Sequence, residues 1–122
     1  MWVAICDDDK LSRSQLIDIA ADYAEQRRDQ TITFGLFSEP QTLLNAVSGG
    51  DIFDIYILDI IMPRMHGIQL GKTLREKSVD SKIIYLSSSR EYALDSYRIR
   101  AFGYLLKPIE KNTFYQTIMS SN

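Results

Sequence analysis

Short apolar segments rich in β-forming residues alternate with longer segments of helical periodicity along the whole chain. We predict five strands, at residues 2–6, 32–37, 53–58, 82–86 and 103–106, with the third and fourth buried on both faces. Apolar residues at three- and four-residue spacing predict helices that include residues 16–24, 40–47, 67–77 and 91–98, and a last helix from about residue 110. Strict alternation of strand and helix predicts an α/β fold with a parallel sheet covered on both faces.

Composition limits the class of protein. The chain has 122 residues, 45% of them hydrophobic, and a formal net charge of -2, which suits one domain and argues against broad, non-specific binding of nucleic acid. Cys6 is the only cysteine, so no internal disulfide can form; we expect a small core residue in a reducing compartment. The first residues lack the basic region of a signal peptide, and no apolar stretch is long enough to cross a membrane. We therefore expect a cytoplasmic domain.

A single carboxylate interrupts the most apolar part of the chain. Asp59 follows Ile-Tyr-Ile-Leu at residues 55–58 and precedes Ile-Ile-Met at residues 60–62. A charged group in such surroundings costs several kcal/mol unless a cation or water reaches it. The position of Asp59 therefore points to a functional site.

Other polar residues follow the remaining strands. In an open parallel sheet, ligands bind at the carboxyl ends of the strands. Asp7, Asp8 and Asp9 follow the first strand, and Asp59 follows the third. Ser87, Ser88 and Ser89 follow the fourth strand, and Lys107 follows the fifth. Carboxylates about 4 Å apart repel by roughly 4 kcal/mol at an effective dielectric constant of 20. They remain ionised together only around a cation, and oxygen ligands of this kind suit Mg²⁺.

The same set of residues suits phosphoryl chemistry. A metal ion held by the acids also binds phosphoryl oxygens, while Lys107 and the Ser87 hydroxyl take the oxygens that remain. Asp59 is the lone acid in its loop and is therefore the best candidate for the nucleophile.

Four segments together resemble the receiver domain of two-component response regulators, the CheY-like family. They are AICDDD, YILDIIMPRMHG, IIYLSSS and GYLLKPI, which match the family's motifs in order and spacing over essentially the whole chain. The resemblance implies a flavodoxin-like, doubly wound (βα)5 fold with strand order 2-1-3-4-5. It also implies that residues 1–122 form one receiver domain, without an output domain among them.

By this resemblance, Asp59 is the phosphoacceptor and takes a phosphoryl group from the phosphohistidine of a sensor histidine kinase. Mg²⁺, or Mn²⁺ in its place, is bound directly by Asp8 and Asp59, through water by Asp7, and by the backbone carbonyl of Ile61. The bulky side chain of Ile61 is expected to screen the acyl phosphate from water. The domain then catalyses only its own phosphorylation and slow dephosphorylation, and is not an enzyme for other substrates.

The resemblance also implies a conformational switch. Ser87 is the switch hydroxyl, Tyr104 the switch aromatic residue and Lys107 the phosphate-sensing ammonium, and the bond between Lys107 and Pro108 is cis. Phosphorylation is expected to reshape the face formed by the fourth helix, fifth strand and last helix, which would bind the chain's own output domain or form a homodimer. The domain itself is expected to contact neither nucleic acid nor membrane.

One segment narrows the resemblance further. The stretch EYALDSYRIRAFGYLLKPI, together with Cys6 in the first strand, is similar to receivers attached to LytTR-type DNA-binding domains. The expected output is therefore control of transcription through such a domain.

Simpler interpretations remain open for single residues. Asp7 and Asp8 would also serve as helix caps, and Asp9 is expected to be the N-cap of the first helix. Ser88 and Ser89 are neighbouring substitutes for Ser87, and Tyr104 would also fit an ordinary strand position. His66, alone in a turn, is expected to face solvent.

Three other functions fit parts of this sequence less well. A haloacid-dehalogenase-type phosphatase uses similar groups, but it places its nucleophile in a DxD motif after the first strand and needs further acids after the lysine. A free-standing or phosphorylation-independent interaction module on the same fold is the main alternative. A nucleotide-binding Rossmann domain is disfavoured, because no glycine-rich loop follows the first strand.

Overall fold

Five parallel strands form the single sheet of the computed structural model, which describes residues 1–28, 31–77 and 80–120. The strands are β1 (Trp2–Cys6), β2 (Thr33–Phe37), β3 (Ile55–Asp59), β4 (Lys82–Ser87) and β5 (Gly103–Leu106). Their order across the sheet is β2-β1-β3-β4-β5, and every neighbouring pair is parallel. The expected doubly wound fold of order 2-1-3-4-5 is confirmed.

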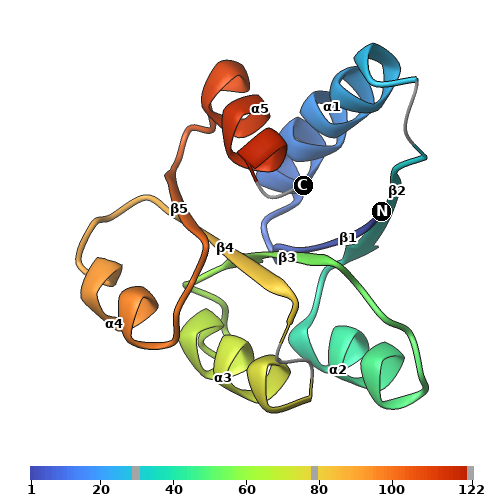
Figure 1. Cartoon of the computed structure of the whole chain (residues 1–122). Helices are drawn as coiled ribbons and strands as arrows, with labels where there is room; N and C mark the ends of the chain where they lie inside the picture. Colours follow the sequence, from blue (N-terminus) through green and yellow to red (C-terminus); the bar gives the residue numbers. More distant parts are fainter. Residues whose placement is uncertain (29–30, 78–79, 121–122) are drawn as a thin grey trace.

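Five helices connect the strands and cover both faces of the sheet. They are α1 (Lys10–Gln26), α2 (Pro40–Ser48), α3 (Gly67–Lys77), α4 (Ala93–Arg98) and α5 (Lys111–Ser120). Helices α1 and α5 lie on one face, and α2, α3 and α4 lie on the other (Figure 1). Among the described residues, no helix combines the length and the apolar character needed to cross a membrane.

The core has two halves, one on each face of the sheet. Alternate residues of the strands point to opposite faces, so the two halves share the same strands. On the α1 and α5 side, Leu16 and Phe114 pack on Ile5 and Ile57. On the other side, residues of α2 and α3 pack on the opposite face of β1, β3 and β4. All five residues of β3 are buried, as predicted for a central strand.

Local chemistry explains where several helices begin. The Asp9 carboxylate accepts a hydrogen bond from the Ser12 amide at 2.9 Å, which caps α1 as predicted. Pro40 is the first residue of α2, where its missing N–H costs nothing. Helix α4 begins at Ala93, later than the expected residue 91, because a turn closed by the Ala93 amide on the Arg90 carbonyl precedes it.

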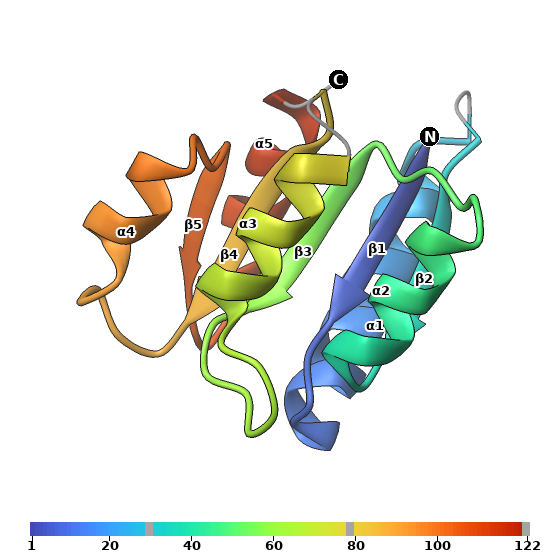
Figure 2. The ribbon, with the colours of Figure 1, turned by 90° about the horizontal axis from the view of Figure 1, so that it is seen from below.

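Because the strands are parallel, their carboxyl ends all lie at the same edge of the sheet. Figure 2 shows β1 and β3 with their arrowheads at the same edge of the sheet, where the loops leading to α1 and α3 begin. The register supports this view, because Cys6 at the end of β1 pairs with Leu58, the residue before Asp59. Residues that follow these two strands therefore share one edge.

Candidate functional site

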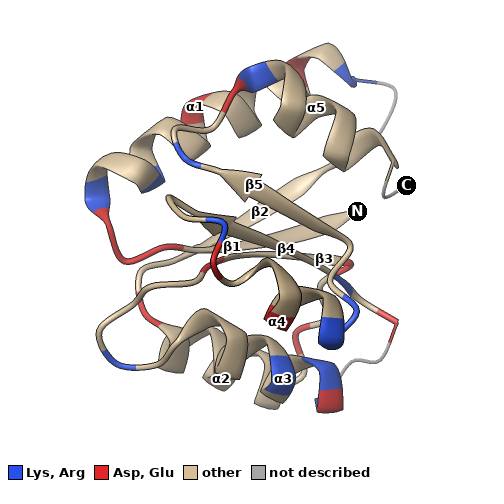
Figure 3. Ribbon diagram, turned by 90° about the vertical axis from the view of Figure 1, so that its left-hand side faces the viewer, with Lys and Arg blue, Asp and Glu red and all other residues tan. Residues whose placement is uncertain are grey.

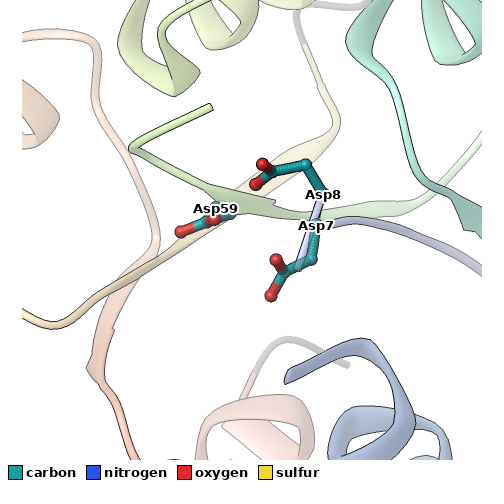
Figure 4. A group of neighbouring side chains, drawn as sticks. All are labelled: Asp7, Asp8 and Asp59. Atoms are coloured by element: carbon teal, nitrogen blue, oxygen red, sulfur yellow. The ribbon is translucent and has the colours of Figure 1, made fainter. Parts of the chain in front are cut away.

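Three carboxylates meet at the carboxyl edge of the sheet. Asp7 and Asp8 directly follow β1, and Asp59 is the last residue of β3. One oxygen of each carboxylate lies within 4.8 Å of the others, and the three side chains project toward the same side (Figure 4). Asp7 and Asp59 are buried, whereas Asp8 is exposed. The structure thus brings together the three acids that the sequence predicted to converge.

Lys107 lies between two of these acids. Its Nζ atom donates a hydrogen bond to Oδ2 of Asp7 at 3.0 Å and forms an ion pair with Oδ1 of Asp59 at 3.3 Å. The residue follows β5, and its amide donates to the Ser87 carbonyl at 2.8 Å, which fixes it beside β4. Its side chain is only 21% exposed, so the lysine belongs to the site and is not a solvated surface charge.

Burial and repulsion dominate the electrostatics of Asp59. Burial, followed by the charge of Asp7, raises the pKa of the Asp59 carboxyl to about 7, and Lys107 offsets only part of this effect. Burial lowers the pKa of Lys107, but its hydrogen bond and ion pair with Asp7 outweigh this, so the net shift is upward. The site holds more negative charge than Lys107 can balance, and a further cation would relieve the excess.

The chemistry of the donors fits a hard divalent cation. Carboxylate oxygens are the ligands that Mg²⁺ and Mn²⁺ prefer, and Mg²⁺ usually keeps several waters beside one or two carboxylates. Exposed Asp8 leaves one side open to water, while buried Asp7 and Asp59 supply fixed charges. These three residues are the ones that would hold the ion.

Neighbours on the loop and on α1 hold the side chain and the backbone carbonyl of Asp7. Its Oδ2 accepts from the Ser12 hydroxyl at 2.6 Å, and its Oδ1 accepts from the Asp9 amide at 3.0 Å. Its backbone carbonyl accepts from the Arg13 guanidinium at 2.9 Å. Sequence reasoning missed Ser12 and Arg13, because only the path of the loop shows that the first turn of α1 folds back onto Asp7.

The serines after β4 occupy different environments. Ser87 is buried, and its Oγ accepts a hydrogen bond from the Ser89 amide at 3.1 Å, whereas Ser88 is exposed. Tyr104 lies half-buried on β5, and its hydroxyl donates to the Ser89 carbonyl at 2.5 Å. Ser87 and Tyr104 therefore contact the same loop, and the peptide bond between Lys107 and Pro108 is cis, as expected.

The loop after β3 leads from Asp59 to the start of α3. Ile61, two residues past Asp59, exposes 55% of its surface. A Cβ atom at Gly67 would overlap with the Asp59 carbonyl oxygen, so only glycine permits this close approach of α3.

His66 is half-buried and does not simply face solvent as expected. Its Nδ1 accepts from the Ile68 amide at 3.2 Å, and its ring packs against the ring of Tyr92.

The structure thus has a doubly wound sheet whose carboxyl edge carries three acids and a lysine, the arrangement expected from the resemblance to receiver domains. The family model described as response regulator receiver domain matches residues 3–119. The chain therefore belongs to the response regulator receiver domain family.

Individual relatives agree with this assignment. The chain is 28% identical over its full length to the positive alginate biosynthesis regulatory protein of Pseudomonas aeruginosa, of which it covers 47%. It is 28% identical over 92% of its length to the sensory transduction protein LytT of Oceanobacillus iheyensis, of which it covers 44%. The chain thus spans about half the length of these relatives. Among solved structures, the chemotaxis response regulator CheY4 of Vibrio cholerae matches with a TM-score of 0.81 and 22% identity, over 99% of this chain and 98% of that one.

Proposed function

We propose that this domain accepts a phosphoryl group on Asp59 from the phosphohistidine of a sensor histidine kinase, in a reaction that depends on Mg²⁺. The observation that carries the proposal is the position of Lys107 between Asp7 and Asp59, beside the exposed Asp8. The arrangement supplies a nucleophile, a fixed cation for a phosphoryl oxygen and a set of oxygen ligands for a metal ion. Family membership supports the same assignment.

The transfer itself needs little covalent chemistry from the protein. A carboxylate oxygen of Asp59 forms the new P–O bond, while the P–N bond of the donor breaks and its electron pair stays on the imidazole nitrogen. The bound metal ion would neutralise charge on the phosphoryl oxygens. Lys107, which pairs with the Asp59 carboxylate before transfer, would pair with one of these oxygens after it, and the buried β3 strand fixes the direction of attack.

The switch would act through the loop after β4. The acyl phosphate adds charge and acceptor oxygens at Asp59, and the Ser87 hydroxyl turns toward them and releases the Ser89 amide. Tyr104 contacts the same loop through the Ser89 carbonyl, so its position responds to the change. The signal then reaches the face of α4, β5 and α5, where Leu94 and Tyr97 expose 61% and 78% of their surfaces. This face would bind the output domain or a second copy of the chain.

The output is proposed to be control of transcription. The relatives named above are a regulatory protein and a sensory transduction protein, and both are about twice as long as this chain. A LytTR-type DNA-binding domain beyond the receiver would account for the extra length. The receiver itself is not proposed to bind nucleic acid, because in the described residues Lys and Arg are interspersed with Asp and Glu and form no single basic band (Figure 3). A cytoplasmic location belongs to the same proposal.

The test is phosphorylation by a small acyl phosphate such as acetyl phosphate. The wild-type domain is expected to gain one phosphoryl group in MgCl₂, seen as a mass increase in the intact protein, and none in EDTA. The Asp59→Asn variant should gain none in either buffer, because it lacks the nucleophile. Unchanged phosphorylation of the variant would refute the assignment of Asp59.

The main alternative functions give different results in the same experiment. A phosphorylation-independent interaction module would gain no phosphoryl group in either buffer. A phosphatase would release phosphate from simple phosphomonoesters with repeated turnover, whereas the proposed receiver would not.

A further inference from the structure

We propose that Ser12 is a positioning residue for the metal-binding side of the site. Its hydroxyl fixes the orientation of the Asp7 carboxylate, so that Oδ2 accepts a hydrogen bond from Lys107 and Oδ1 stays available to the metal ion or to its bound water. The inference rests on the proposed function, because it assigns a role within the same site. Neither the motifs nor the family match assigns a role to Ser12.

The contact is short and buried. The Ser12 Oγ donates to Oδ2 of Asp7 at 2.6 Å, and Lys107 donates to the same oxygen at 3.0 Å. The Asp7 side chain is fully buried, and Ser12 is 8% exposed. Water therefore cannot readily replace the serine hydroxyl if it is removed.

The two carboxylate oxygens of Asp7 accept different numbers of hydrogen bonds. A carboxylate offers about four lone-pair positions, two on each oxygen. Among the described residues, Ser12 and Lys107 fill both positions on Oδ2, and the Asp9 amide at 3.0 Å fills one on Oδ1. One position remains on Oδ1. That position is the one available to a metal ion or to its bound water.

The hydroxyl is not needed to begin the helix. The backbone amide of Ser12 is already capped by the Asp9 carboxylate at 2.9 Å, and Ser12 lies in the first turn of α1. A hydroxyl that served only helix formation would bond to the local backbone. That of Ser12 instead bonds to a side chain of the site, five residues earlier in the sequence.

Loss of the hydroxyl should weaken metal binding more than it weakens the fold. Without the Ser12 hydroxyl, the Asp7 carboxylate can rotate more freely, and metal binding must then fix its orientation. Removal of a partner that orients a metal ligand typically lowers metal affinity about 10- to 100-fold. Because the Asp9 amide and Lys107 still hold Asp7, we expect a smaller loss of roughly 3- to 10-fold.

The experiment compares Mg²⁺ binding by the wild type and four variants of the domain. Ser12→Ala removes the hydroxyl, and Ser12→Thr and Ser12→Val form a pair of equal shape that differs only in having or lacking it. Ser14→Ala is the control, since Ser14 is an exposed serine of the same helix. The dissociation constant is measured by titrating MgCl₂ and following backbone amide shifts. The gain in Tm on adding MgCl₂ is measured for each protein.

The proposal predicts that Ser12→Ala and Ser12→Val bind Mg²⁺ roughly 3- to 10-fold more weakly and gain less Tm from it, while Ser12→Thr and Ser14→Ala stay within about twofold of wild type. A purely structural role would lower the metal-free Tm and leave the gain from Mg²⁺ unchanged. That result, or equal binding by the Thr and Val variants, would overturn the proposal. If the wild type itself binds no Mg²⁺ and accepts no phosphoryl group, the proposed function fails as well.

Discussion

At the scale of single residues, the surroundings of Asp59 act on its ionisation in opposite directions: burial and Asp7 oppose it, and Lys107 favours it. The carboxyl is buried beside Asp7, which raises its pKa to about 7, yet the proposed phosphoryl transfer requires its ionised form. Lys107 favours the ionised form but is shared with Asp7. The ionised Asp59 should therefore lower the free energy of unfolding, which can be measured.

The first prediction concerns the pH dependence of stability in EDTA. The Asp59 pKa is about 7 in the folded protein and 3.8 ordinarily, so between these values the folded state binds more protons than the unfolded state. Asp59 therefore lowers the free energy of unfolding progressively as pH rises through this window, by at most about 4 kcal/mol at 1.36 kcal/mol per pKa unit. Asp59→Asn removes this cost.

Urea unfolding at about pH 5 and about pH 8 checks this expectation. The Asn variant should be more stable than the wild type, and its advantage should widen toward about pH 8. An advantage that is independent of pH, or that shrinks as the pH rises, would show that Asp59 is not destabilised by its surroundings.

A second prediction concerns the lifetime of the phosphorylated state. The Ile61 side chain is apolar, 55% exposed and two residues past Asp59, where it can screen an acyl phosphate from water. Ile61→Asn should therefore lose its phosphoryl group faster after the donor is removed, because a polar side chain admits and orients water. Ile52→Asn is the control, since Ile52 is exposed but precedes β3 at the opposite edge of the sheet. Equal decay in all three proteins would refute the screening role.

At the scale of elements, α3 packs unusually closely on the sheet. A Cβ atom at Gly71 would overlap with the hydroxyl of Tyr85 on β4, and it would also press on Ile99. The Tyr85 ring is fully buried, and its hydroxyl has no hydrogen-bond partner among the described residues. The pair Gly71 and Tyr85 therefore sets how near α3 lies to β4.

A third prediction tests this packing by a double-mutant cycle. Gly71→Ala should lower the free energy of unfolding by roughly 1–3 kcal/mol through overpacking, even after the gain of about 1 kcal/mol that alanine brings to a helix. Tyr85→Phe should stay within about 1 kcal/mol of the wild type, because it removes a hydroxyl without a partner.

The double variant carries the decisive comparison. It should be more stable than the sum of the two single changes predicts, because the phenylalanine frees part of the space that the alanine methyl needs. Strict additivity, measured by urea unfolding, would show that the two residues do not compete for space.

At the scale of the whole molecule, the fold was largely predictable, because strand and helix periodicities alternate without interruption. The site was predictable in outline for the same reason, since parallel strands deliver the residues after them to one edge. Individual contacts between segments that lie apart in the sequence were not predictable. The bond from Ser12 to Asp7, the packing of His66 on Tyr92 and the close approach at Gly71 all depend on how separate elements meet in space.

The central claim is that Asp59 carries the phosphoryl group, and the most direct measurement locates that group in the chain. The domain is treated with acetyl phosphate and MgCl₂, then with borohydride, which reduces an aspartyl phosphate to homoserine, and its peptides are sequenced by mass spectrometry. We expect homoserine at position 59, and none when EDTA replaces MgCl₂. Homoserine at Asp7 or Asp8, or no homoserine at all from the wild-type domain in MgCl₂, would contradict it.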